Sequence, residues 1–130
     1  MHEELQKTLR ERYPRIFPFA HPNRDPHAVS SFSGFECWDG WFDLLDALCL
    51  NLQAATDFRG SPQVVAVQVK EKFGALRFYT DVADAGQRGM IELAESMSAR
   101  LCEKCGNRGE LMSRKGWIMT RCPAHSGGDS

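Results

Sequence analysis

Four potential metal ligands near the C-terminus are the residues of this sequence best suited to do chemistry. They form two pairs, Cys102-x-x-Cys105 and Cys122-x-x-His125, with sixteen residues between the pairs. A spacing of two residues lets both members of a pair turn toward one ion, and thiolates with imidazole form a ligand set that zinc prefers. The sequence therefore predicts one zinc ion held by these four side chains.

The residues around the quartet favour a structural role for the metal. Gly106 directly follows the second ligand, where it relieves crowding as backbone amides approach the thiolates. Residues 109–121 predict two short strands around a turn at 114–116, a hairpin that carries the second pair back over the first. Because the protein supplies all four ligands, no coordination position is left for a reactive water.

Two other interpretations of the cysteines are weaker. A redox Cys-x-x-Cys motif needs no second ligand pair at a distance. A treble-clef nuclease of the His-Asn-His type carries a general-base histidine in its hairpin, whereas residues 106–121 contain no histidine. We therefore interpret the quartet as a closed, structural zinc site.

Hydrophobic periodicity predicts the elements that must position these ligands. The expected elements are a helix over residues 3–13, a helix from Asp39 to about 55, strands over 64–69 and 76–80 joined by a turn at 70–74, and a third helix from about 84 to 101. Asp39 is the expected N-cap of the second helix, and Asp84-Ala85-Gly86-Gln87 resembles a capping box. In the third helix the expected apolar stripe consists of Met90, Leu93, Ala94, Met97 and Leu101. This pattern predicts an α+β fold in which three helices pack on a β-hairpin, followed by a finger of the zinc-ribbon or zinc-knuckle type.

The length of 130 residues suits one compact unit. Its expected parts are an α+β body over 1–99, a zinc finger over 100–125 packed on that body, and a disordered tail over 126–130. Residues 18–34, which are rich in proline and polar side chains, predict an irregular connection. A finger of this size cannot bury enough apolar surface to fold without its metal.

The formal net charge of −1 conceals an asymmetry between the two parts. Residues 1–99 carry ten basic and fourteen acidic side chains, whereas residues 100–125 carry six basic and two acidic ones. The finger is therefore basic and the body acidic. Five cysteines and a charged N-terminus indicate a reducing cytoplasm, and no apolar run approaches the length of a membrane span.

Two further sets of residues have a composition that can support binding. The acidic set of Glu36, Asp39, Asp43 and Asp46 lies largely on one helical face; a solvated surface is the simpler interpretation, and a divalent-cation site the alternative. The predicted hairpin carries a second set, which combines basic and aromatic side chains: Lys70, Lys72, Phe73, Arg77 and Tyr79. Such a set can stack on bases or anchor a protein partner, or else belong to the core and its rim.

Several motifs along the chain resemble those of small proteins encoded by tailed bacteriophages and prophages. The motifs are Tyr13-Pro14-x-Ile16-Phe17, Gly34-Phe35-Glu36-Cys37-x-Asp39-Gly40-Trp41-Phe42, Val69-Lys70-Glu71-Lys72-Phe73-Gly74-x-Leu76-Arg77-Phe78-Tyr79, Cys102-Glu103-x-Cys105-Gly106 and Gly116-Trp117-x-x-Thr120-x-Cys122-x-x-His125. The resemblance covers most of the chain. It implies a phage context and a bound zinc ion, and no particular reaction.

The first functional hypothesis is therefore a zinc-stabilised phage or prophage accessory protein that binds a host protein, as an inhibitor of host defence or of host regulation. Its expected contact surface contains the exposed parts of Trp38 and Trp41 and the hairpin residues Lys70, Lys72, Phe73, Arg77 and Tyr79; membership of the core is an equal alternative for the two tryptophans.

Two alternatives remain open at the level of the sequence. The second hypothesis is a nucleic-acid-binding protein whose finger contacts phosphates through Arg100, Lys104, Arg108, Arg114, Lys115 and Arg121. The third is an enzyme with a metal-dependent site near Glu36, Asp39 and Lys70.

Overall fold

The computed structural model describes residues 1–18, 32 and 34–127 of the chain. Its elements in chain order are α1 (Glu3–Arg12), β1 (Phe35–Glu36), the 3-10 turn η1 (Asp39–Trp41), α2 (Phe42–Arg59), β2 (Ala66–Lys72), β3 (Ala75–Thr80), α3 (Ala85–Ser98), β4 (Glu110–Arg114), β5 (Trp117–Arg121) and the 3-10 turn η2 (Pro123–His125). Most of the expected irregular connection over 18–34 and most of the expected tail over 126–130 lie outside the described residues. The fold is mixed α and β, as the sequence predicts.

The main sheet has three strands, one more than the predicted hairpin. Its order is β1-β2-β3, with β1 parallel to β2 and β3 antiparallel to β2. Sequence periodicity missed β1 because two residues are too few to show an alternating pattern. The β2–β3 connection is also tighter than the expected 70–74 turn, since only Phe73 and Gly74 lie between the strands.

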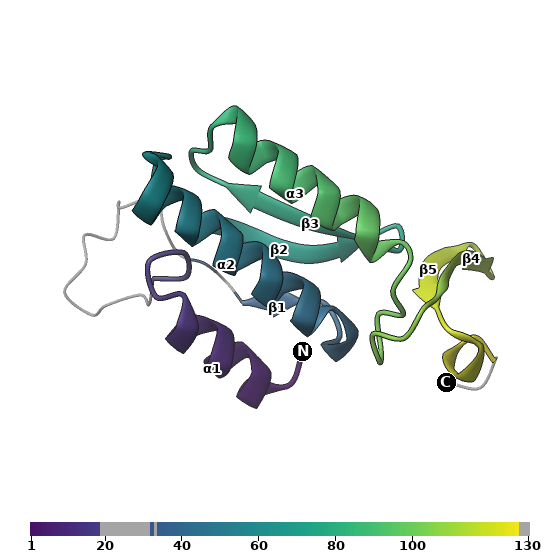
Figure 1. Ribbon diagram of the computed structural model, residues 1–130. Helices are drawn as coiled ribbons and strands as arrows, with labels where there is room; N and C mark the ends of the chain where they lie inside the picture. The colour runs from purple at the N-terminus through teal and green to yellow at the C-terminus, as the bar shows by residue number, and fades with distance from the viewer. Residues whose placement is uncertain (19–31, 33, 128–130) are drawn as a thin grey trace.

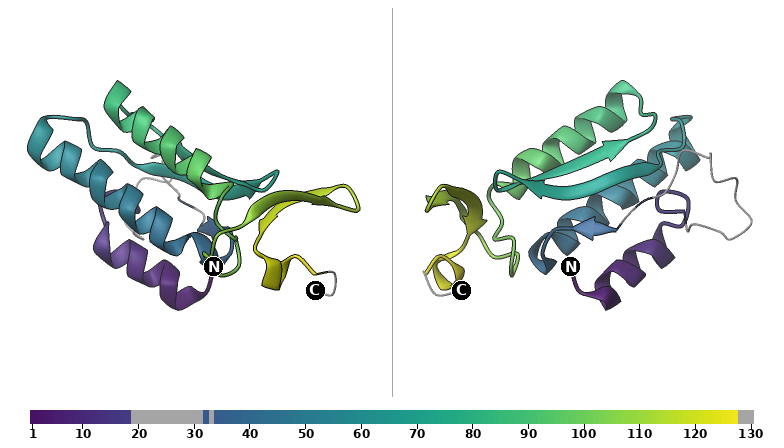
Figure 2. Two further views of the ribbon diagram at one scale, coloured as in Figure 1. Left: turned by 45° about the vertical axis from the view of Figure 1, so that its right-hand side comes forward. Right: turned by 180° about the vertical axis from the view of Figure 1, so that it is seen from behind.

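The helices cover one face of this sheet. Figures 1 and 2 show α2 and α3 side by side over the strands, with α1 next to α2. Fully buried side chains from both layers form the core; among the largest are Leu9, Trp41, Leu45, Leu52, Val69 and Leu76. Burial of such side chains contributes roughly 1.5–3 kcal/mol each.

The start of the second helix differs from the prediction. Asp39 opens a separate 3-10 turn, η1, and α2 begins only at Phe42 without a side-chain cap. The Asp39 carboxylate instead accepts hydrogen bonds from the backbone N–H and the ring of His2, at 2.7 and 2.5 Å. The other end of α2 lies beyond the expected 55, at Gly60, whose φ of 76° closes the helix in the left-handed conformation.

The third helix begins with the predicted capping box, and its buried face matches the expected stripe only in part: Ala94 is buried, and Met90 and Leu101 pack against the core. Asp84 accepts from the Gln87 backbone N–H, and the Gln87 side chain accepts in return from the Asp84 N–H. Gln87, Ile91, Ala94 and Ser98 are buried, whereas Leu93 and Met97 of the expected stripe are exposed. Both polar members of the buried face have partners, because Gln87 donates to the Pro62 carbonyl and Ser98 accepts from the Leu76 N–H.

The opposite face of the sheet carries the polar side chains of β2 and β3. Successive side chains of a strand point to opposite faces of the sheet. Leu76 and Phe78 of β3 point into the core, so Arg77 and Tyr79 point away from it. Lys70 lies opposite Arg77 in the antiparallel register. No helix within the described ranges covers this side, which Figure 2 shows from behind. We call the surface formed by Lys70, Lys72, Arg77 and Tyr79 the open face.

No helix among the described residues is both long enough and apolar enough to cross a lipid bilayer.

Candidate metal centre

The first ligand pair lies in a tight turn that follows α3. The Gly106 N–H donates to the Cys102 carbonyl at 2.8 Å, and the Cys102 N–H donates to the Asn107 carbonyl at 2.7 Å. Gly106 has a φ of 80°, a conformation that glycine adopts at no steric cost. These bonds fold the chain back on itself and hold Cys102 and Cys105 on one side of the turn.

The second pair is positioned by η2, directly after β5. The His125 N–H donates to the Cys122 carbonyl at 3.0 Å, which closes a single 3-10 turn. Residues three apart in a 3-10 helix lie nearly above one another, so this turn aligns the two ligands. The hairpin of β4 and β5, which turns at Lys115 and Gly116 as predicted, carries the pair back toward the first turn.

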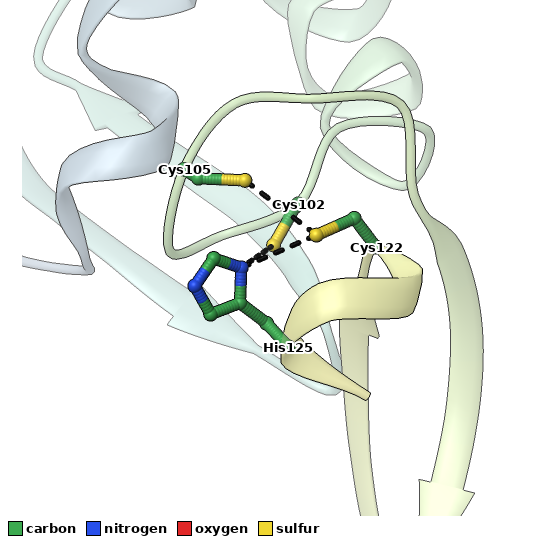
Figure 3. Close-up of side chains that lie close together, drawn as sticks. All are labelled: Cys102, Cys105, Cys122 and His125. Atoms are coloured by element: carbon green, nitrogen blue, oxygen red, sulfur yellow. Dashed lines mark hydrogen bonds between the residues drawn. The ribbon is translucent and has the colours of Figure 1, made fainter. Parts of the chain in front are cut away.

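The four ligand atoms converge on one point. All lie within 4.8 Å of one another, and Figure 3 shows the three sulfur atoms and the His125 ring facing a common centre. The Cys105 and Cys122 sulfurs are 3.6 Å apart, and Nδ1 of His125 lies 3.2 Å from the Cys122 sulfur and 3.7 Å from that of Cys102. A tetrahedral ion with metal–sulfur bonds of about 2.3 Å places its ligands about 3.5–3.8 Å apart. The quartet therefore fits a tetrahedral metal ion.

The surroundings of the quartet shift the pKa values of two of its sulfurs in opposite directions. Burial raises the pKa of Cys102, but hydrogen bonds from backbone amides near Cys122, Cys105 and Lys104 outweigh burial and lower the pKa to about 6. At Cys105 the Asn107 amide lowers the pKa, yet burial and the neighbouring thiols prevail and raise it. Several thiolates crowded together require a cation, because each disfavours ionisation of the next.

No protein-family model, curated protein or solved structure matches this chain. The chemistry of the centre is therefore inferred from its own residues. Within the described ranges, the quartet is the one cluster of three or more histidine, cysteine or acidic side chains close enough to hold a metal.

The ligand turn packs directly against η1 of the body. The Gly40 N–H donates to the Glu103 carbonyl at 2.8 Å, and the Trp41 indole N–H donates to the Leu101 carbonyl at 3.0 Å. A Cβ atom on Gly40 would lie 2.1 Å from the Cys102 carbonyl oxygen. Only glycine permits so close an approach of two backbones.

Glu103, between the first two ligands, fixes the turn to the hairpin. Its backbone N–H donates to the Thr120 carbonyl at 3.0 Å, and its carboxylate accepts from the Thr120 N–H at 2.8 Å. The Thr120 hydroxyl in turn donates to the Gly74 carbonyl at 2.6 Å, so the β2–β3 turn joins the same network. Residues 100–125, which we call the metal module, are thus attached to the body at Gly40 and at Gly74.

The basic residues predicted to contact phosphates do not form one surface. Arg121 is largely buried and lies 3.7 Å from the Glu103 carboxylate, so its prediction as a phosphate contact is wrong. Lys104 lies over the Trp38 ring, 5.2 Å from the ring centroid. Lys115 lies in the turn of the β4–β5 hairpin. Arg108 lines a different hollow of the module, together with Arg121. Arg100 is exposed just after α3, and Arg114 is half-buried at the end of β4.

The residues of the predicted partner surface differ in their exposure. Phe73 is 65% exposed and Tyr79 43%, and Lys70 and Arg77 share the open face with Tyr79. Trp41 is completely buried and anchors the metal module through its indole, so it belongs to no contact surface. Trp38 is half exposed beneath Lys104.

The acidic residues predicted as a possible cation site have separate partners. Asp39 binds His2, whereas Asp46 accepts a hydrogen bond from the Tyr13 hydroxyl at 2.6 Å and pairs with Arg12 at 3.0 Å. Asp43 is exposed, and Glu36 lies across from Lys70 in the parallel register of β1 and β2. The metal cluster described above includes none of these carboxylates.

Sequence reasoning missed the exposed apolar residues of the β4–β5 hairpin. Trp117 is 74% exposed, Leu111 54% and Ile118 39%. A signal for Trp117 was present, since a residue that follows a Lys-Gly hairpin turn lies at the tip of its hairpin.

The two cysteines outside the centre are expected to be inert in the folded protein. Burial raises the pKa of Cys37 from its ordinary 9.0 to about 12 and that of Cys49 well above its ordinary value. Since the thiolate is the reactive form, we expect iodoacetamide at pH 8 to modify native Cys37 roughly a thousandfold more slowly than a free cysteine. Mass spectrometry of peptides from the labelled protein measures this rate.

Labelling in the presence of a chelator distinguishes the cysteines of the quartet from the two buried ones. In protein that holds a metal at the quartet, Cys102, Cys105 and Cys122 should become reactive once a chelator removes it, while Cys37 and Cys49 require denaturant. Rapid labelling of Cys37 in the native, metal-loaded protein would contradict its burial in the core.

Proposed function

We propose that this chain is a zinc-stabilised accessory protein of a tailed bacteriophage or prophage that binds a host protein in the bacterial cytoplasm, as an inhibitor of host defence or regulation. The observation that carries the binding role is the exposed aromatic and basic surface formed jointly by the open face and the metal module. The phage context is supported by the motif resemblance.

The ion that we propose is a single zinc with a structural role. Three sulfurs and one imidazole nitrogen at tetrahedral separations suit zinc better than oxygen-preferring cations. In this proposal residues 100–125 form a finger of the zinc-ribbon or zinc-knuckle type. When bound, the ion would cross-link the two turns that carry the ligands. The finger contacts the body at Gly40 and at Gly74.

The proposed contact surface combines the features of binding hot spots. Tyr79, Phe73 and Trp117 are large and exposed, although burial in the core is the usual place for such side chains. Lys70 and Arg77 lie beside Tyr79 on the open face and can supply charged contacts at the rim.

A charge reversal on the open face tests this proposal. We expect immobilised wild-type protein to retain a specific host protein, and Arg77→Glu to weaken that binding roughly tenfold or more, because the contact changes from attractive to repulsive. Binding of the purified host protein is measured by biolayer interferometry. Arg88→Glu is the matched control, since it makes the same charge change on α3, in the layer behind the sheet. Equal loss in both variants, or no retained protein, would overturn the proposal.

Nucleic-acid binding is the second candidate function, favoured by the grouping of Lys70, Arg77 and Tyr79 on one face. It predicts that a single-stranded oligonucleotide binds with an affinity that falls steeply as salt rises, because phosphate contacts release counterions. Fluorescence anisotropy over a salt series measures this slope. A flat or undetectable response would exclude this candidate.

A further inference from the structure

We infer that a cleft between the β2–β3 and β4–β5 turns binds an acidic, extended protein segment that carries an apolar anchor side chain. The cleft has a volume of about 410 Å³, and we call it the tip cleft; its lining residues are Glu71, Lys72, Phe73, Lys115, Gly116, Trp117 and Ile118. This inference rests on the proposed function, and it specifies the site and the chemistry of the partner.

The two turns that border the tip cleft hold bulky side chains in an unfavourable backbone conformation. Both turns have two central residues with positive φ, as type I′ turns require: Phe73 at 54° with Gly74 at 81°, and Lys115 at 49° with Gly116 at 84°. Asn or Gly is the usual first central residue, because the left-handed region is costly for other side chains. The backbone conformation of the turns therefore does not favour Phe73 or Lys115 at these positions, and the contact that the structure gives the Phe73 ring is with Lys72, whose Nζ lies 5.7 Å from the ring centroid.

The exposure of the aromatic rings strengthens this argument. Phe73 is 65% exposed and Trp117 74%, so neither ring contributes much to the core. Unfavourable backbone conformations that persist in a fold tend to occur at binding and active sites. Here two of them border the same cleft, one on each turn, and this coincidence points to a ligand.

The charges of the tip cleft select an acidic ligand. Lys72 and Lys115 are exposed at its rim. The one acidic residue that lines the tip cleft is Glu71, and its carboxylate accepts a hydrogen bond from the Gly74 N–H at 2.7 Å. Phe73, Trp117 and Ile118 supply the apolar wall, which can enclose an aromatic or aliphatic side chain between the two lysines.

A protein segment fits these features better than a nucleic acid does. A polyanion binds through a series of phosphate contacts along its backbone, whereas the basic residues of the metal module are dispersed. Arg121 pairs with Glu103 inside the module and Lys104 lies over Trp38. The tip cleft itself offers two lysines, Lys72 and Lys115, which suit a short acidic segment rather than a long polyanion.

The Phe73→Asn substitution distinguishes a role of Phe73 in binding from a role in folding. We expect Phe73→Asn to leave the Tm unchanged or raise it by about 2–4 °C, because Asn is favoured at this turn position. The probe is a fluorescein-labelled peptide of sequence DDEWEDD in about 150 mM NaCl, a physiological ionic strength. Phe73→Asn should weaken its binding about tenfold or more, and Trp117→Ser should do the same.

Phe58→Asn is the matched control, since Phe58 is 83% exposed near the end of α2 and makes no part of the tip cleft. We expect this variant to bind the peptide as the wild type does, and the peptide to shift the Trp117 indole resonance in NMR spectra. The inference is overturned if the peptide does not bind, if Phe73→Asn binds it unchanged, or if a decathymidine oligonucleotide binds more tightly at the same salt.

The host protein distinguishes failure of this inference from failure of the proposed function. If Phe73→Asn retains the host protein while Arg77→Glu loses it, the tip cleft is not the site and the proposed function stands. Peptide binding at the tip cleft without any retained host protein would instead overturn the proposed function. The inference that the tip cleft binds acidic segments would then still stand.

Discussion

Cys105→Ser is expected to abolish metal binding and to unfold the metal module. The remaining three ligands leave the tetrahedron open, and binding free energies of structural zinc sites in small modules amount to about 10–16 kcal/mol at neutral pH. The module has no apolar core of its own beside the metal and its hydrogen bonds, since Trp117, Leu111 and Ile118 are exposed. Metal analysis should fall from about one zinc per chain to near zero.

The body should survive this substitution in a weakened form. Its core of helices and sheet lies apart from the quartet, but Gly40 and Trp41 lose their hydrogen-bond partners at Glu103 and Leu101. We therefore expect a lower Tm and fast amide exchange over residues 100–125, with slow exchange retained in α2 and β2. Hydrogen exchange followed by mass spectrometry resolves the two regions.

A second variant changes a ligand of the quartet but keeps four ligands, and so serves as the control for Cys105→Ser. His125→Cys changes the ligand set to four thiolates, which is also a common structural zinc set, so it should retain the metal and the native exchange pattern. Native thermal stability of Cys105→Ser, or purified wild-type protein without metal in the absence of chelators, would contradict the structural centre.

The parts of the fold that sequence predicted correctly depend on short stretches of chain. The ligand pairs, the capping box of Asp84 and Gln87, and the hairpin turn at Lys115 and Gly116 each involve residues at most four positions apart. Local geometry alone determines which side chains meet in such stretches.

Contacts between distant segments were beyond prediction from periodicity. The approach of Gly40 to Cys102 joins residues that are far apart in the chain, and no pattern around either residue reports it. The buried face of α3 was misjudged for a related reason. Hydropathy ranks Leu93 and Met97 above Gln87 and Ser98, but the polar pair finds hydrogen-bond partners in the interior.

Trp41 illustrates how the same limit affected the candidate site. It was placed on the expected partner surface because aromatic side chains are favoured interface anchors, whereas the ring is fully buried and its indole N–H donates to the Leu101 carbonyl. Trp117 shows the converse, because it is exposed at a hairpin tip that only the assembled fold brings beside Phe73.

Gly40→Ala is expected to cause the second large loss, by separating the metal module from the body. The added Cβ would lie 2.1 Å from the Cys102 carbonyl oxygen and 2.6 Å from backbone atoms of Glu103. The atoms in conflict belong to backbone rather than to flexible side-chain ends, so the two segments must move apart. We expect a loss of about 3 kcal/mol or more in the free energy of unfolding, which chemical denaturation measures.

Gly89→Ala provides the matched control for this substitution. Gly89 lies inside α3 with no heavy atom near the position of an added Cβ. Alanine there should stabilise the protein by about 0.5–1 kcal/mol, because it lowers the conformational entropy of the unfolded chain. The two identical substitutions are therefore expected to have effects of opposite sign.

The metal content of Gly40→Ala identifies which link of the structure has failed. The quartet is built within residues 102–125, so the variant should still bind about one metal ion per chain while the Trp41 indole N–H loses its slow exchange. Retention of both the metal and wild-type stability would mean that Gly40 is not needed for the contact between the metal module and the body. Simultaneous loss of the metal would mean that the centre depends on the body for its own assembly.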